Sequence, residues 1–126
     1  MSKNVVYSPN APEPIGPYSQ AIKAGNFLFV SGQIAIEQST GKIITTTIQD
    51  ETHQVMKNIK EILIAANTDL QSIVKCSIFL KDMNNFPEIN TIYGSYFPHQ
   101  PPARETIEVS RLPKDVNVEI SCIAVM

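Results

Sequence analysis

The sequence has few of the features that nucleic-acid binders and membrane proteins require. Its 10 Lys and Arg residues are scattered singly among 12 Asp and Glu residues, and the formal net charge is -2. A nucleic-acid binder would carry a basic face instead. No apolar window is long enough to span a membrane, and the N-terminal residues lack the apolar core of a signal peptide. We therefore expect neither a nucleic-acid partner nor a membrane partner.

Cysteine and histidine are also scarce, with two residues of each. Cys76 and Cys122 lie in apolar, strand-like runs, and neither has a metal-ligand spacing to His53 or His99. We expect both to be small buried residues in the reducing cytoplasm, although the sequence alone leaves a disulfide open. No Gly-rich phosphate loop and no Ser-His-Asp signature occur. No metal site is therefore predicted.

The length of 126 residues and the 43% hydrophobic content fit one globular domain, residues 1–126, with a modest core that favours oligomerisation. Apolar patterns predict strands at 5–7, 19–24, 27–31, 34–37, 73–80, 105–110 and 116–125, and helices at 47–66 and 85–97. Gly25-Asn26 predicts a hairpin turn, and Leu112 to Asp115 a turn that joins the last two strands as a second hairpin. This order predicts an α+β fold, a mixed sheet with both helices on one face. A partner subunit would cover the other face.

Several polar positions carry more detailed expectations. Thr47 with Asp50, or Thr46 with Gln49, would cap the first helix, and Asn67 would end it in a left-handed conformation. Glu51 and Asn58 fall on the polar side of this helix, and His53 borders that side as a surface residue. Asn90 lies in or beside the apolar stripe of the second helix, where backbone groups are its favoured partners. On the 73–80 strand, Val74 is placed on the same face as Cys76.

Two charged residues lie in the otherwise apolar strands near the C-terminus. Arg104 follows Pro101-Pro102-Ala103, and Glu119 lies between Val118 and Ile120. An Arg side chain can bind a carboxylate through two parallel hydrogen bonds, and desolvation raises the pKa of a lone Glu toward the range of a general acid or base. Two interpretations stay open, a pocket for a small carboxylic acid with an activated water and a structural Arg–Glu pair on one sheet face. The two residues alone favour the structural pair.

Longer motifs favour the ligand pocket over the structural pair. In chain order they are Ala11-Pro12, Ile15-Gly16-Pro17-Tyr18-Ser19-Gln20, Val30-Ser31-Gly32-Gln33-Ile34, Val74-Lys75-Cys76, Lys81-Asp82-Met83, Asn90 to Phe97, Pro102-Ala103-Arg104, Val109 to Asp115 and Val118-Glu119-Ile120. Together they resemble the Rid family, the reactive intermediate imine deaminases, and in particular its RidA branch. The resemblance covers nearly the whole chain, and the last three motifs are the most specific because their spacing and residue types occur together.

The resemblance implies a chorismate-mutase-like α+β fold assembled as a homotrimer that packs the other sheet face, with sites in the clefts between subunits. It implies hydrolysis of 2-iminopropanoate and 2-iminobutanoate, tautomers of enamines such as 2-aminoacrylate, to 2-oxo acids and ammonia, without metal or organic cofactor. By position, Arg104 would bind the substrate carboxylate and Glu119 would activate water. The remaining site residues would be Tyr18, Ser31, Gly32, Asn90 and Thr106.

One departure and two alternatives accompany this prediction. Many relatives carry Cys where this chain has Thr106, which keeps a hydrogen-bonding group but removes thiol chemistry. The hydrolysis needs no nucleophilic Cys, so we expect activity to survive. Family members are also described as ribonucleases, translation inhibitors or chaperone-like proteins, and the acidic balance argues against RNA binding. A ligand-sensing trimer without turnover is the other alternative.

Overall fold

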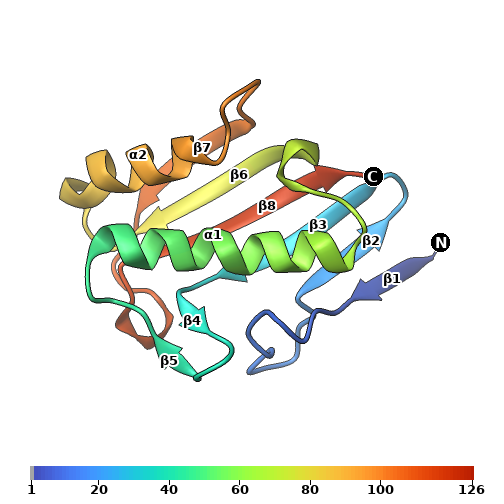
Figure 1. Cartoon of the computed structure of the whole chain (residues 1–126), viewed down its shortest axis with the longest axis horizontal. Coiled ribbons are helices and arrows are strands. Elements are labelled where there is room, and N and C mark those ends of the chain that lie inside the picture. Colours follow the sequence, from blue (N-terminus) through green and yellow to red (C-terminus); the bar gives the residue numbers. More distant parts are fainter. Residues whose placement is uncertain (1) are drawn as a thin grey trace.

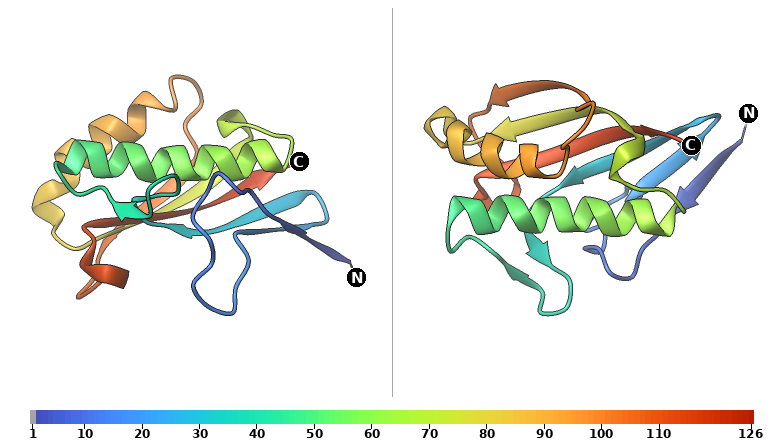
Figure 2. Two further views of the ribbon diagram at one scale, coloured as in Figure 1. Left: turned by 60° about the horizontal axis from the view of Figure 1, so that its bottom comes forward. Right: turned by 45° about the horizontal axis from the view of Figure 1, so that its top comes forward.

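The computed structural model describes residues 2–126. Six strands form one sheet in the order β1-β2-β3-β8-β6-β7, and β4 and β5 form a separate two-stranded hairpin. Helices α1 and α2 both lie on one face of the sheet (Figures 1 and 2), so the predicted α+β architecture is confirmed. The bounds are β1 Lys3–Val6, β2 Ala21–Ala24, β3 Phe27–Gln33, β4 Ile36–Glu37, β5 Lys42–Ile43, α1 Ile48–Ala65, β6 Ile73–Leu80, α2 Phe86–Ser95, β7 Ala103–Glu108 and β8 Val118–Val125.

The predicted hairpin at the C-terminus is wrong, although both of its strands exist. β7 pairs in parallel with β6, and β8 lies between β3 and β6, antiparallel to both. The chain connects β6 to β7 through α2, the type of crossover that joins parallel strands. β8 lies in the more central place, where every second residue of it is buried, whereas no residue of β7 at the sheet edge is fully buried. Arg104 and Glu119 therefore do not share a hairpin.

The predicted turn, helix cap and helix end are confirmed, because each depends on residues close together along the chain. β2 and β3 form the predicted hairpin, and Gly25 takes a φ of 59° in its turn. The hydroxyl of Thr47 accepts a hydrogen bond from the Asp50 N–H at 3.0 Å, so Thr47 is the N-cap of α1. Asn67 follows the helix with a φ of 61°. In β6 a register shift at Val74 leaves this residue exposed, contrary to the alternation expected there.

The helix-covered face of the sheet holds the main core. Alternate side chains of β3, β6 and β8 meet the apolar stripe of α1 there; the largest fully buried ones are Leu28, Met56, Ile59, Ile62, Leu63, Ile78, Leu80 and Ile120. The opposite face stays open in the single chain. Phe27, Phe29 and Val125 are each at least 40% exposed on neighbouring strands β3 and β8. The helices thus cover one face of the sheet as expected, and cover of the other face by a partner subunit stays a prediction.

Glu51 contradicts the helical-wheel prediction, because it is fully buried instead of solvated. Its carboxylate accepts hydrogen bonds from the backbone N–H of Asn117 at 2.7 Å, from the Asn117 side-chain amide at 2.7 Å and from the Val118 N–H at 3.2 Å. Three donors offset the cost of burying the charge. The first turn of α1 is thereby tied to the first residue of β8, directly beside Glu119.

Asn58 and His53 also differ from the prediction. The buried Asn58 amide donates to the carbonyls of Ile34 at 3.0 Å and Ile36 at 2.9 Å, which ties β4 to α1. His53 is half-buried, and its Nδ1 lies 2.7 Å from the Tyr96 hydroxyl. Both side chains connect α1 to neighbouring segments.

Candidate active site

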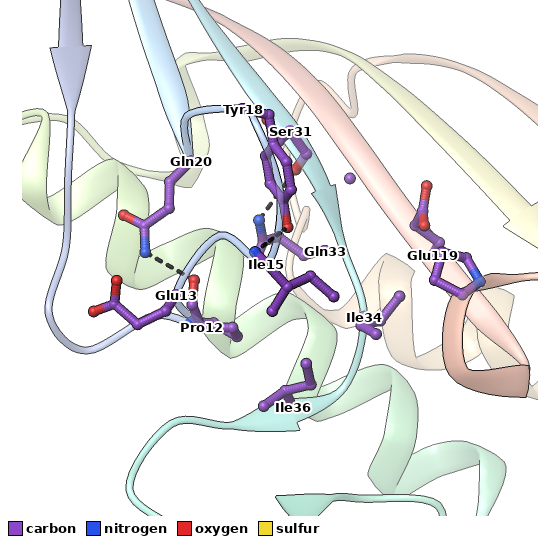
Figure 3. A pocket seen from close by; sticks show the side chains of 12 residues that line it. Pro12, Glu13, Ile15, Tyr18, Gln20, Ser31, Gln33, Ile34, Ile36 and Glu119 are labelled. Carbon is purple, nitrogen blue, oxygen red and sulfur yellow. Dashed lines mark hydrogen bonds between the residues drawn. The ribbon is translucent and has the colours of Figure 1, made fainter. Parts of the chain in front are cut away.

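A pocket of about 390 Å³ opens where the Pro-rich loop, the end of β3 and the start of β8 meet. Four of the predicted site residues line it, namely Tyr18, Ser31, Gly32 and Glu119 (Figure 3). The other lining residues are Pro12, Glu13, Ile15, Gln20, Gln33, Ile34, Ile36 and Pro113. Its size lies within the range of small-molecule sites in proteins.

The wall contributed by the Pro-rich loop depends on Gln20. This buried amide accepts from the Ser8 N–H at 2.7 Å and donates to the carbonyls of Ser8 at 3.1 Å and Pro12 at 3.0 Å. Prolines lack an N–H, so a side chain has to satisfy part of the loop backbone. Sequence reasoning included Gln20 in the motif that runs from Ile15 to Gln20 but assigned it no role in the site. Ser31 adds a second tie, because its hydroxyl donates to the Ser19 carbonyl at 2.6 Å.

Glu119 lies across the backbone of β3 at Gly32. The pairing of β3 with β8 changes register between Val30 and Gln33, and the carboxylate occupies the space beside the glycine. A Cβ atom at Gly32 would lie 2.5 Å from Oε2 and 2.8 Å from Cδ of Glu119. The absence of a side chain at Gly32 therefore makes room for this carboxylate. Burial raises the pKa of Glu119, with no neighbouring charge to lower it.

A second group of predicted residues lies between β7 and α2. Nη1 of Arg104 donates to Oδ1 of Asn90 at 2.7 Å, and its guanidinium carbon lies 5.1 Å from the ring centre of Tyr93 and 5.4 Å from that of Phe86. Asn90 therefore has a side-chain partner and not the backbone partner that was favoured. These contacts orient an Arg side chain that is otherwise exposed.

Two hydroxyl groups beside Arg104 are buried without a hydrogen-bond partner among residues 2–126, those of Thr106 and Tyr93. Thr106 lies two residues after Arg104 on β7, so both side chains project from the same face. Unpaired buried hydroxyls are uncommon and indicate a place for a water or a ligand group. The sequence placed Tyr93 only in an apolar stripe, and its contact with Arg104 depends on how α2 crosses β7.

The two groups lie on opposite faces of the sheet. Arg104 is in register with the buried Cys76 and faces α2, whereas Glu119 alternates with buried residues and faces the other way. Through β6, Glu119 aligns with Ile107, three residues beyond Arg104. Standard strand spacings place their Cα atoms roughly 14 Å apart. The two ion pairs found among residues 2–126, Lys75–Glu105 and Arg111–Asp115, do not include them, so they form no structural pair within one chain.

The two cysteines lie in the core of the fold, away from the pocket lining. Cys76 and Cys122 are free, buried and opposite each other on β6 and β8, as expected for small core residues, and burial raises the pKa of both thiols. Between residues 2 and 126, no three His, Cys, Asp or Glu side chains are grouped to hold a metal ion. In the same part of the chain, neither helix combines the length and apolarity needed to cross a bilayer.

Comparison with known proteins agrees with this architecture. Solved structures of closely similar fold include a putative endoribonuclease from Thermotoga maritima, with a TM-score of 0.96 and 42% identity over 100% of this chain and 98% of that one. They also include E. coli TdcF with bound serine, with a TM-score of 0.93 and 37% identity over 98% of both chains.

Relatives of known sequence also align with nearly the full length of this chain. A RutC family protein from Pyrococcus horikoshii is 56% identical over 97% of both chains. Reactive Intermediate Deaminase A, chloroplastic, from Arabidopsis thaliana is 45% identical over 100% of this chain and 67% of its own length. A 2-iminobutanoate/2-iminopropanoate deaminase from Dermatophagoides farinae is 40% identical over 98% and 97%. Residues 8–126 match the family model described as Endoribonuclease L-PSP, and the chain therefore belongs to this family, that of the Rid and RutC proteins.

Proposed function

We propose that this protein hydrolyses reactive 2-imino acids, including 2-iminopropanoate, 2-iminobutanoate and the enamine tautomer 2-aminoacrylate, to 2-oxo acids and ammonia. The observation that carries the proposal is the half-buried Glu119 carboxylate beside Gly32, in a pocket of small-molecule size. Its raised pKa suits a general base near neutral pH. Relatives named as deaminases, at 40% and 45% identity, support the same reaction class.

The complete site in this proposal combines two subunits of a homotrimer. The pocket around Glu119 is lined by two carboxylates and by no Lys or Arg, so it has no cation to bind a substrate carboxylate. Arg104 of the same chain lies on the other face of the sheet. The Arg104 side chain of a neighbouring subunit would enter the pocket instead. The exposed apolar residues of the open sheet face, such as Phe27 and Phe29, support packing against other subunits.

The proposed chemistry requires only orientation and one base. Arg104 binds the substrate carboxylate, and Asn90, Phe86 and Tyr93 keep the guanidinium in place. Glu119 accepts a proton from water while the water oxygen bonds to the imine carbon, and the proton then passes to the nitrogen. Glu119 then takes the hydroxyl proton of this adduct and passes it to the amino group, so that the C=O bond forms as the C–N bond breaks and ammonia leaves. The imine carbon is already electrophilic, so positioned groups suffice.

The experiment couples a threonine or serine dehydratase to the purified protein and follows release of the 2-oxo acid. Faster release with wild type, and loss of most of that acceleration in a folded Arg104→Ala variant, supports the deaminase. Unchanged release, with 2-oxobutanoate still bound, would instead support the ligand-sensing trimer. The ribonuclease alternative finds little support in the site, because Glu13 and Glu119 would repel the phosphates of RNA.

A mixing experiment tests the shared site separately. Arg104→Ala and Glu119→Gln subunits would each be inactive alone, but some sites in mixed trimers receive a native Arg104 from one subunit and a native Glu119 from the next. Random association in a 1:1 mixture restores about a quarter of the wild-type sites. Recovery requires subunit exchange, which unfolding and refolding the mixture provides. No recovery after demonstrated exchange would contradict a site that takes Arg104 from one subunit and Glu119 from the next.

A further inference from the structure

Two consecutive residues in the turn before β8 have a strained backbone. Lys114 has a φ of 56° and Asp115 a φ of 55°, a left-handed conformation that residues other than glycine rarely adopt. Such strain persists only where the surrounding contacts hold the backbone in place, and it is common beside functional sites. Pro113 of the same turn lines the pocket around Glu119. We therefore asked which contacts hold this turn and the start of β8.

The turn itself is held by an ion pair and a small core. Arg111 donates two hydrogen bonds to the Asp115 carboxylate, at 2.8 Å and 3.2 Å. Leu112 and Val116 form a buried cluster with Ile34. These contacts act on residues 111–116, so they do not fix the position of the strand that follows.

The ladder between β3 and β8 leaves the start of β8 open on one side. The last register pair of the two strands is Gln33 with Ile120, and just before it two residues of β3 lie opposite Ser121 alone. A bulge of this kind changes the direction of nearby side chains. Glu119 lies beyond the last pair, so its place beside Gly32 needs a further support on the β3 side.

Glu51 of α1 supplies this support. Its fully buried Oε2 accepts hydrogen bonds from the backbone N–H groups of Asn117 at 2.7 Å and Val118 at 3.2 Å, and its Oε1 accepts one from the Asn117 side chain at 2.7 Å. Hydrogen bonds to a charged acceptor are stronger than those between neutral groups. The start of α1 and the turn before β8 lie at the same end of the sheet (Figures 1 and 2). The carboxylate thereby holds the two residues that precede Glu119.

We infer that Glu51 is a positioning residue for the proposed base: it holds the start of β8 against the strained turn and so keeps the Glu119 carboxylate beside Gly32. The inference rests on the proposed imine hydrolysis and adds a residue on the helix-covered face of the sheet. Without the Glu51 carboxylate the turn relaxes, and residues 117–119 shift with it. A shift of about 1 Å at the base costs on the order of 100-fold in rate.

Three substitutions of Glu51 test this role in the dehydratase-coupled assay. Glu51→Ala removes both acceptor oxygens, so kcat for 2-aminoacrylate should fall about 100-fold. KM should stay near that of wild type, because Arg104 still binds the substrate carboxylate in the proposed site. Glu51→Gln keeps one oxygen for the two backbone N–H groups and loses only the bond from the Asn117 side chain, so it should retain most of the wild-type kcat. Glu51→Asp is one methylene too short and should lie between these two.

The matched control is Leu63→Ala, which destabilises the other end of the same helix. Leu63 is fully buried and follows Glu51 in α1 at a distance of about 18 Å along the axis. A cavity there lowers stability without a contact to the start of β8. Urea unfolding identifies conditions in which every variant is folded, and Glu51→Asp carries the test if Glu51→Ala does not fold. Crystal structures of the variants report the position of Glu119 independently of turnover.

The outcomes separate this inference from the proposed function. A large loss of kcat in Glu51→Ala with Glu119 displaced from Gly32, recovery in Glu51→Gln and no loss in Leu63→Ala support it. Wild-type kcat in Glu51→Ala, equal losses in Glu51→Ala and Leu63→Ala, or an effect on KM alone would overturn it and leave the deaminase standing. If wild type hydrolyses no imine, the proposed function fails and the crystal structures decide: an unmoved Glu119 in Glu51→Ala contradicts the positioning role, and a displaced one supports it.

Discussion

Gly32→Ala is the sharpest perturbation that the site allows, because it adds one methyl group directly against the proposed base. The new Cβ would lie 2.5 Å from Oε2, 2.8 Å from Cδ and 3.1 Å from Cγ of Glu119. Ordinary contacts between such atoms begin near 3.5 Å. The carboxylate must therefore move by about 1 Å, which it can do because it ends a flexible side chain beside an open pocket.

The expected effect on turnover is large and the effect on stability is small. A misplacement of about 1 Å costs on the order of 100-fold in rate, equivalent to about 2.7 kcal/mol in activation free energy. Gly32 is exposed and has no positive φ, so the alanine itself introduces no backbone strain. We expect kcat for 2-aminoacrylate hydrolysis to fall about 100-fold, while the urea midpoint of unfolding stays near that of wild type.

The dehydratase-coupled assay measures this loss, and Gly94→Ala is the matched control. Gly94 lies in α2, and a Cβ atom there would meet nothing within 4 Å. Alanine in a helix stabilises by roughly 0.5–1 kcal/mol relative to glycine. The control should therefore be slightly more stable and fully active. Gly32→Ala with wild-type kcat, and with a crystal structure showing the carboxylate displaced, would refute the role of Glu119 as the positioned base.

Further predictions concern the half-buried Glu119 and the fully buried Glu51. Because burial raises the pKa of Glu119 above its ordinary value of 4.5, the acid limb of kcat/KM should lie above pH 4.5. The same shift means that the stability contributed by Glu119 is fully present below its unfolded pKa and is lost as the pH rises through its folded pKa. Thermal unfolding should therefore show Glu119→Gln to be more stable than wild type at pH 7 and equal near pH 3.5; a constant difference at both values would contradict the shift. Glu51→Gln leaves donors near Asn117 without an acceptor, so urea unfolding should show a loss of roughly 2–4 kcal/mol, while the exposed Glu88→Gln control changes little.

Local features of this chain could be predicted because their causes lie within a few residues of each other. The turn at Gly25, the cap at Thr47 and the helix end at Asn67 each depend on one residue type at one position. Gly32 was named as a site residue from the family motif. Its partner was not visible, because Glu119 is brought there by a change of register between β3 and β8.

Features that depend on distant partners could not be read from periodicity. Glu51 falls on the polar side of a helical wheel, yet its partner Asn117 lies 66 residues away and makes burial favourable. Proximity in sequence made a hairpin of the last two strands the natural expectation, but α2 carries the chain across so that β7 pairs with β6. The family motifs named candidate site residues without indicating the sheet face of each. Arg104 and Glu119 could therefore be named together before it was known that one chain holds them apart.

The separation of these two charges has an energetic consequence for the proposed site. An anionic substrate about 5 Å from the Glu119 carboxylate is repelled by roughly 3 kcal/mol at an effective dielectric constant near 20. A guanidinium at a similar distance from the substrate offsets that repulsion, but Arg104 of the same chain faces α2 on the other side of the sheet. A lone subunit would then carry the base without the means to hold its substrate. In the proposed site, binding of the carboxylate would be coupled to assembly. Asn90, Phe86 and Tyr93 would contribute by orienting the Arg104 side chain before a neighbour docks.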